Sequence, residues 1–200
     1  MEMMRTFVAI ELDDAVLNAL RQVQDELRRA PVARLARWVS TSGIHLTLKF
    51  LGDVSSERVP EITQAIERGC RSSAPFRISL STAGFFPNAH RLRVVWVGVD
   101  GDVEMLLQLQ RAVESELNAL GFAPEGRGFQ PHLTLARMRD YARPSDREEM
   151  AKRINTVQVH THSEMQVREV HLIRSELRPT GAVYTPLATV PLRSQSLSNL

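Results

Sequence analysis

The tetrapeptide His-Leu-Thr-Leu occurs twice in this chain, at residues 45–48 and 132–135, and it constrains the fold more than any other feature. Each copy alternates polar and apolar residues, which is typical of a half-buried β-strand rather than of a helix. The leucines would face the core, and the histidine and threonine would share the other face, roughly 7 Å apart. The repeat therefore predicts two similar strands, each presenting an imidazole beside a hydroxyl.

The flanking sequence predicts further strands and helices. Apolar residues spaced three and four positions apart predict four helices. The first follows a cap at Asp13-Asp14, and the others begin at residue 59, extend over 102–120 and begin at 144. Strand patterns occur at 6–12, 38–39, 76–83, 92–99, 156–160, 167–175 and 183–192. The elements before and after each histidine come in a similar order, which suits an α+β domain built from two related lobes. We expect one bilobal domain over residues 1–193 and a disordered tail over 194–200.

Composition limits the classes of protein that fit. A hydrophobic content of 43% with 24% charged residues is ordinary for a globular protein, and a net charge of +2 gives no global case for binding a polyanion. Any phosphate site must therefore be local. No apolar run approaches the ~20 residues of a membrane span, no signal peptide is apparent, and the single Cys70 cannot form an internal disulfide. We expect a monomeric, cytoplasmic protein that does not bind membranes.

Two imidazoles suit acid–base chemistry at phosphorus. One can take a proton from the attacking oxygen while the other gives one to the leaving oxygen. A cleft with one histidine from each lobe matches in-line displacement, and two threonine hydroxyls could donate to the non-bridging oxygens. Such a site would need no metal or cofactor, and neither histidine is accompanied by the ligand spacing of a metal site. A single His-x-Thr is more often structural, but two identical copies favour catalysis.

These motifs resemble a known family, the two-histidine phosphoesterases, and within it the RNA 2′,3′-cyclic phosphodiesterases, also called 2′-5′ RNA ligases. The resemblance covers nearly the whole chain, at residues 5–10, 38, 45–52, 84–88, 95–99, 129–137 and 174–177. It implies a bilobal α+β fold with pseudo-symmetric lobes, each with a mainly antiparallel sheet and outer helices, and an active-site cleft between them. It also implies metal-independent hydrolysis of a 2′,3′-cyclic phosphate to a 2′-phosphomonoester.

The resemblance also implies roles for residues. His132 would be the proton acceptor that activates water, and His45 the proton donor to the departing 3′ oxygen, although near symmetry allows the reverse. Thr47 and Thr134 would stabilise the phosphoryl oxygens. The substrates would be RNA with 2′,3′-cyclic phosphate ends or cyclic nucleotides. Reversible 2′-5′ joining of RNA halves, or RNA binding without turnover, are the alternatives.

Other residues are candidates for binding substrate. Arg127 resembles the family's basic residue beside the cleft, and the competing interpretation is a loop arginine in solvent. Lys49 lies four residues after His45, so strict alternation places it on the same face, where it would add positive potential. Arg137 belongs to the family pattern, but strict alternation places it opposite His132 and predicts a structural role. Aromatic side chains that could stack on a base, or pack in the core instead, are Phe7, Phe85, Phe129 and Tyr184.

Overall fold

The computed structural model describes residues 2–126, 128–160, 163–178 and 181–193. Arg127 and the expected tail at 194–200 lie outside these residues. The strands are β1 (Met3–Glu11), β2 (Ala36–Trp38), β3 (His45–Ser55), β4 (Phe76–Phe86), β5 (Val94–Gly101), β6 (His132–Met138), β7 (Glu164–Val167), β8 (Glu169–Arg178) and β9 (Gly181–Pro191). The helices are α1 (Asp14–Arg28), α2 (Val59–Cys70), α3 (Val103–Ala119) and α4 (Pro144–Thr156), with 3-10 turns η1 (Pro31–Leu35), η2 (Thr41–Gly43) and η3 (Ser56–Arg58).

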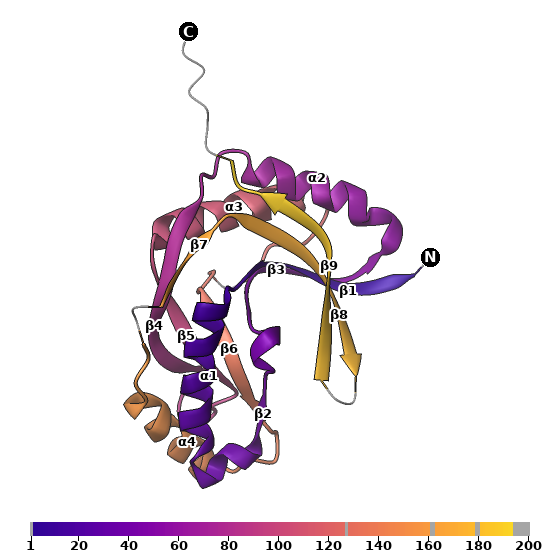
Figure 1. Cartoon of the computed structure of the whole chain (residues 1–200). Coiled ribbons are helices and arrows are strands. Elements are labelled where there is room, and N and C mark those ends of the chain that lie inside the picture. The colour runs from indigo at the N-terminus through magenta and orange to yellow at the C-terminus, as the bar shows by residue number, and fades with distance from the viewer. Residues whose placement is uncertain (1, 127, 161–162, 179–180, 194–200) are drawn as a thin grey trace.

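The strands of the described residues form one curled antiparallel sheet (Figure 1). Its order is β7-β4-β5-β6-β3-β1-β8-β9, and β2 pairs with the far end of β6. The two histidine strands are neighbours at the middle, joined by the single pair Leu46–Leu133. We call β3, β1, β8 and β9 the first half-sheet, and β6, β5, β4, β7 and β2 the second. The expected α+β class with antiparallel sheets is confirmed, and the two sheets are continuous through that one pair.

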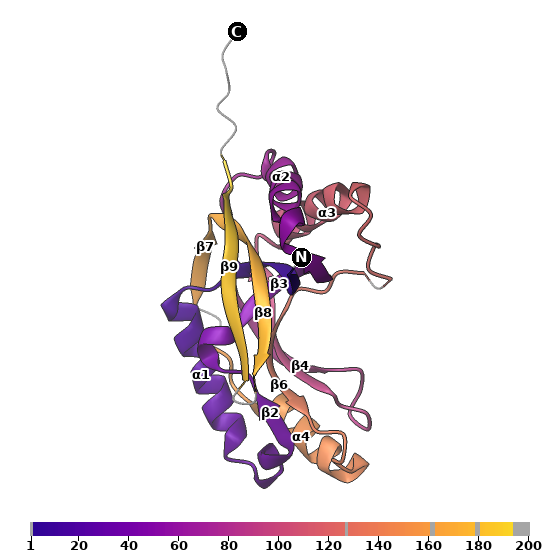
Figure 2. The same ribbon diagram turned by 90° about the vertical axis from the view of Figure 1, so that its right-hand side faces the viewer.

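Helices α1 and α3 each cross to the other half-sheet. Helix α1 follows β1 of the first half-sheet and packs beside β7 of the second, and α3 follows β5 of the second and packs beside β3 of the first. The order strand, helix, histidine strand occurs as β1–α1–β3 and again as β5–α3–β6. Figures 1 and 2 show α2 beside α3 at one end of the sheet and α1 with α4 at the other. As predicted, α1 begins at a cap, since the Asp13 carboxylate accepts from the Val16 amide at 2.9 Å. The main core lies between these helices and one face of the sheet.

One predicted strand, at 156–160, is wrong. Helix α4 continues to Thr156, and the described residues 157–160 after it have no strand pairing. The alternation there has a different cause, because Val157 and Val159 both pack partly buried against the main core without joining a ladder. Alternation of apolar and polar residues indicates that one face is buried. It does not show that a neighbouring strand is present to pair with.

Both histidine strands contain a β-bulge immediately after the threonine. In β3, Thr47 pairs with Ala9 and Lys49 pairs with Val8, so Leu48 is an extra residue. In β6, the equivalent Leu135 is extra, because the pairs with β5 pass from Thr134 to Ala136 across consecutive β5 residues. An extra residue reverses the alternation that follows it. The side chains of Phe50 and Arg137 are thereby turned to the same face as the histidines.

A buried glutamine holds each bulge. Gln24 of α1 is 1% exposed, and its Nε2 donates to the carbonyls of Leu135 at 3.0 Å and Val39 at 2.9 Å. Gln110 of α3 is 4% exposed, and its Nε2 donates to the Leu48 carbonyl at 3.4 Å. Each helix thus binds the bulge of the opposite half-sheet. At Leu135 the glutamine is a second donor, because the carbonyl also accepts from the Val39 amide at 2.9 Å. These contacts add hydrogen bonds to the buried bulge carbonyls.

Removing these donors should destabilise the fold. Gln24→Leu and Gln110→Leu keep similar volume but leave a buried carbonyl with one donor fewer, so each is expected to lower the free energy of unfolding by about 1–3 kcal/mol in urea titrations. Gln22→Leu and Gln108→Leu, at exposed positions of the same helices, are matched controls that should change it by less than about 0.5 kcal/mol. Equal effects in buried and exposed pairs would contradict this role.

Candidate active site

The two histidines lie at the junction of the half-sheets on one shared face. Leu46 and Leu133 are paired, so continuing that register by one residue sets Thr47 opposite His132 and His45 opposite Thr134. His45 and His132 are then diagonal neighbours, a relation in which residues are about 7–8 Å apart. The leucines of both copies are at most 2% exposed, which confirms the predicted division of faces. We call the face with both histidines and both threonines the histidine face.

Both imidazoles are held in the same tautomer. His45 Nδ1 lies 3.0 Å from the Gly43 carbonyl, and His132 Nδ1 lies 2.7 Å from the Gln130 carbonyl. Because a carbonyl only accepts, Nδ1 carries the hydrogen in each ring and donates it. In each case the carbonyl belongs to the second residue before the histidine. This geometry leaves Nε2 of each ring to exchange protons with a substrate.

Aromatic rings enclose His45. Phe7 stacks on the imidazole with centroids 4.5 Å apart, and Tyr184 meets it edge-on at 5.0 Å. Burial lowers the pKa of His45 to about 4, against a smaller opposing effect of the hydrogen bond to Gly43. In the free protein at neutral pH, His45 is therefore uncharged.

His132 has an aromatic environment of its own from the second half-sheet. Phe86 meets it edge-on at 5.2 Å, and Trp96 lies 6.5 Å away. Trp96 rests over Gly84, where a Cβ atom would come within 2.3 Å of the indole ring. The glycine is thus required by close packing. Each histidine is flanked by two aromatic side chains, one of them from a neighbouring strand.

Arg137 lies on the histidine face, contrary to the structural role that strict alternation predicted. Val94 and Trp96 are two residues apart on β5 and pair with Arg137 and Thr134, so both partners share a face. The pKa of Tyr184 is raised by burial, and the charges of Arg137 and Arg5 act in the opposite direction. Arg137 of β6 and Tyr184 of β9 therefore lie within electrostatic range of each other, although they belong to different half-sheets.

Lys49 does not lie on the histidine face, where strict alternation predicted it. Its side chain is 1% exposed, and its ammonium group donates to a Glu114 carboxylate oxygen at 3.0 Å and to the Ala123 carbonyl at 2.9 Å. The bulge at Leu48 turned it into the protein, so it is a structural ion pair and not a substrate ligand. Phe50 takes its place on the histidine face, 53% exposed and 5.9 Å from Phe7.

The remaining candidates divide between site and core. Phe7 and Tyr184 are beside His45 as expected, although Phe7 is only 2% exposed and so supports the imidazole from behind. Phe129 and Phe85 pack partly buried against the main core. Sequence reasoning missed Phe50 and Phe86. The available signal for Phe50 was its position, five residues after His45, which is equivalent to that of Arg137 after His132.

The hollow beside His45 is small. A pocket of about 150 Å³ is lined by Glu11, Leu12, Leu17, Ser42, Gly43, Ile44, His45, Ile173 and Tyr184. Small-molecule sites usually enclose ~300–1,000 Å³, so the body of a larger substrate would lie along the open histidine face. Within the residues that the structure describes, no three His, Cys, Asp or Glu side chains are grouped as for a metal ion.

Burial of His45 should make stability depend on pH. The folded state holds its pKa near 4, below the ordinary 6.5, so the unfolded chain binds the proton first and stability is lost as pH falls from about 6.5 to about 4. Between pH 7 and pH 5 the wild type should lose about 2 kcal/mol more than His45→Gln in urea unfolding. His160→Gln, at an exposed position, should behave as the wild type. Equal losses in the wild type and His45→Gln would contradict the burial argument.

Comparison with known proteins agrees with this geometry. The family model of the 2′-5′ RNA ligase superfamily matches residues 17–179. A protein of Methanothermobacter thermautotrophicus named RNA 2′,3′-cyclic phosphodiesterase is 37% identical, over 92% of this chain and 96% of its own length.

Solved structures show the same fold. The crystal structure of TT0787 of Thermus thermophilus matches with a TM-score of 0.76 at 30% identity, covering 96% of this chain and all of that one. Escherichia coli LigT in its apo form matches with a TM-score of 0.76 at 27% identity, over 97% of this chain and all of that one. With family model, relatives and paired histidine motifs in agreement over most of its length, this chain belongs to the 2′-5′ RNA ligase superfamily, as its sequence predicted.

Proposed function

We propose that this protein hydrolyses 2′,3′-cyclic phosphates at RNA ends to 2′-phosphomonoesters. The observation that carries the proposal is the pair of imidazoles on one face, each with Nδ1 bound to a carbonyl and Nε2 left for substrate. The relative in Methanothermobacter bears the name of this activity. One cyclic phosphate placed between the two rings would meet a proton acceptor on one side of phosphorus and a proton donor on the other.

In this mechanism, His132 Nε2 accepts a proton from water as the water oxygen attacks phosphorus. The bond from phosphorus to the 3′ oxygen breaks, and His45 donates the proton that this oxygen takes up. The hydroxyls of Thr47 and Thr134 donate to the two non-bridging oxygens, where negative charge increases. The products are a free 3′ hydroxyl and a 2′-phosphate, and the two imidazoles exchange protonation states.

For His45 to act as proton donor, it must be protonated when the substrate is bound. In the free protein, burial lowers its pKa to about 4, and the negative charge of a bound phosphate would raise that pKa. The proton would then be present chiefly when there is a leaving oxygen to receive it. Arg137 supplies further positive charge on the same face, and Phe50 offers an exposed ring on which a base can stack. A contact from Arg127 remains a prediction.

Ligation is the second candidate, because the same groups in the same roles would join a 2′,3′-cyclic end to a 5′ hydroxyl. The 5′ hydroxyl would attack phosphorus in place of water, the bond to the 3′ oxygen would break, and a 2′-5′ bond would form. The family model's description, the 2′-5′ RNA ligase superfamily, favours it specifically. Incubating paired RNA halves and looking for a 2′-5′ linked product tests it directly.

The expected monomeric state and cytoplasmic location remain predictions. No helix in the described ranges combines the length and the apolar character that crossing a bilayer requires.

Loss of either catalytic histidine should abolish turnover. His45→Ala and His132→Ala are each expected to lower kcat/KM for a cyclic-ended oligonucleotide by at least about a thousandfold, because each removes a proton-transfer group. The wild type should retain its activity in excess chelator. His90→Ala, which alters an exposed histidine paired with Glu148, is the control. A wild type inactive on nucleotide and oligonucleotide alike, or dependent on added metal, would refute the proposal.

Sulfur substitution distinguishes the acid from the base. An analogue with sulfur in place of the leaving 3′ oxygen releases a thiolate, which needs protonation far less because thiol pKa values lie near 8.5. In single-turnover assays, this analogue should restore much of the activity lost in His45→Ala and little of that lost in His132→Ala. Selective rescue of His132→Ala instead would exchange the two roles.

A further inference from the structure

Two arginines on paired strands face one another directly. Arg37 of β2 is in register with Arg137 of β6, and both side chains are exposed. Directly opposite residues of an antiparallel pair share a face, with Cβ atoms about 5 Å apart, and like charges there are destabilising. The pair therefore carries a local excess of positive charge where β2, a strand of only three residues, meets β6.

Arg37 points to the histidine face. Its register partner Arg137 shares that face with Thr134, as their β5 partners show. The next residue, Trp38, turns to the helix side, where the Arg28 guanidinium lies 5.0 Å from its ring centre. Successive residues of a strand alternate between faces, so the placement of Trp38 independently sets Arg37 on the open side.

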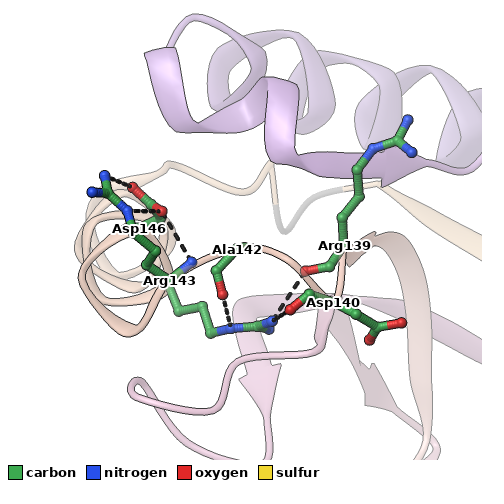
Figure 3. A network of polar contacts seen from close by, with 6 residues as sticks. Arg139, Asp140, Ala142, Arg143 and Asp146 are labelled. Atoms are coloured by element: carbon green, nitrogen blue, oxygen red, sulfur yellow. Dashed lines mark hydrogen bonds and ion pairs between the residues drawn. The ribbon is translucent and has the colours of Figure 1, made fainter.

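The protein does not neutralise this pair within the described residues. Some other arginines do have partners. Arg143 Nε donates to Asp146 Oδ2 at 3.1 Å, and the Arg147 guanidinium donates to the carbonyls of Arg139, Asp140 and Ala142. Figure 3 shows Arg143 beside Asp146 and these three carbonyls. Neither Arg37 nor Arg137 forms an ion pair with any described side chain. An anion from outside the protein would relieve the repulsion.

The pair lies one short step from the reacting groups. On β5, Trp96 marks the row of Thr134 and Val94 marks the row of Arg137 and Arg37, two residues further along. A strand rises ~3.4 Å per residue, so the rows are about 7 Å apart. A chain that leaves the histidines toward β2 meets Arg137 and then Arg37.

We propose that Arg37 binds the phosphodiester that joins the terminal nucleotide of the RNA to the nucleotide before it. The inference rests on the proposed function, since a nucleotide with a 2′,3′-cyclic phosphate can bear its next phosphate only on the 5′ oxygen. Arginine is well suited to that contact through charge-assisted hydrogen bonds. The site thereby selects a polynucleotide end over a free cyclic nucleotide, with Arg137 between the two phosphates.

Substrates of different length test this assignment. The probes are a nucleoside 2′,3′-cyclic phosphate with a 5′ hydroxyl, and a dinucleotide with the same cyclic end. Arg37→Gln should lower kcat/KM for the dinucleotide by about tenfold while changing that for the mononucleotide less than about twofold. It should also reduce the salt dependence of log kcat/KM for the dinucleotide by a slope of about 0.7, the value for one single-strand phosphate contact. Arg37→Lys should retain part of the preference.

Arg21→Gln is the matched control, because it removes the same charge from an exposed position of α1. It should leave both substrates unaffected. Without RNA, Arg37→Gln should also raise Tm relative to the wild type and to Arg21→Gln, since it relieves the repulsion from Arg137. Equal losses on both substrates, or no loss on either, would overturn the assignment, as would a Tm that does not rise. A wild type inactive on both would instead refute the proposed function itself.

Discussion

Hydrogen bonds from two buried glutamines to bulge carbonyls are the constraint on which the site depends. Without the bulges at Leu48 and Leu135, strict alternation would turn Arg137 and Phe50 toward the helices, and Lys49 would emerge beside the histidines. A bulge interrupts the regular ladder, and buried carbonyls at such a point are stabilised by further donors. Gln24 and Gln110 supply them from helices that belong to the opposite half of the chain. The crossed packing of α1 and α3 and the local geometry of the site are thus stabilised by the same hydrogen bonds.

Burial serves the chemistry as well as the fold. Phe7 and Tyr184 pack around His45 with the same apolar surfaces that other aromatic residues present to the core, and the result is an imidazole that resists charging. The enclosing rings also fix the ring plane, while the Gly43 carbonyl fixes the tautomer. The cost is a stability that declines in acid.

Sequence pattern predicted much of this structure, and its failures have physical causes. The repeated tetrapeptide predicted two strands, the buried leucines and the face shared by His45 and His132, because period two is a direct consequence of strand geometry. It could not predict the bulges, since an extra residue leaves no mark in a short apolar run. Lys49 and Arg137 were therefore both assigned to the wrong face. The false strand at 156–160 arose because packing of Val157 and Val159 imitates the pattern without the pairing.

The near symmetry of the site also explains how it can handle an asymmetric substrate. The backbone treats both halves alike: each strand has a histidine bound through Nδ1, a threonine, a bulge and a glutamine from the other half. Positions five residues after each histidine differ, with an exposed aromatic ring at Phe50 and a cation at Arg137. A ring attracts a base and a guanidinium attracts a phosphate, so the two ends of a nucleotide have distinct partners across a symmetric frame. Orientation of the substrate, and with it the choice of which imidazole receives the proton, then follows from side chains rather than from the backbone.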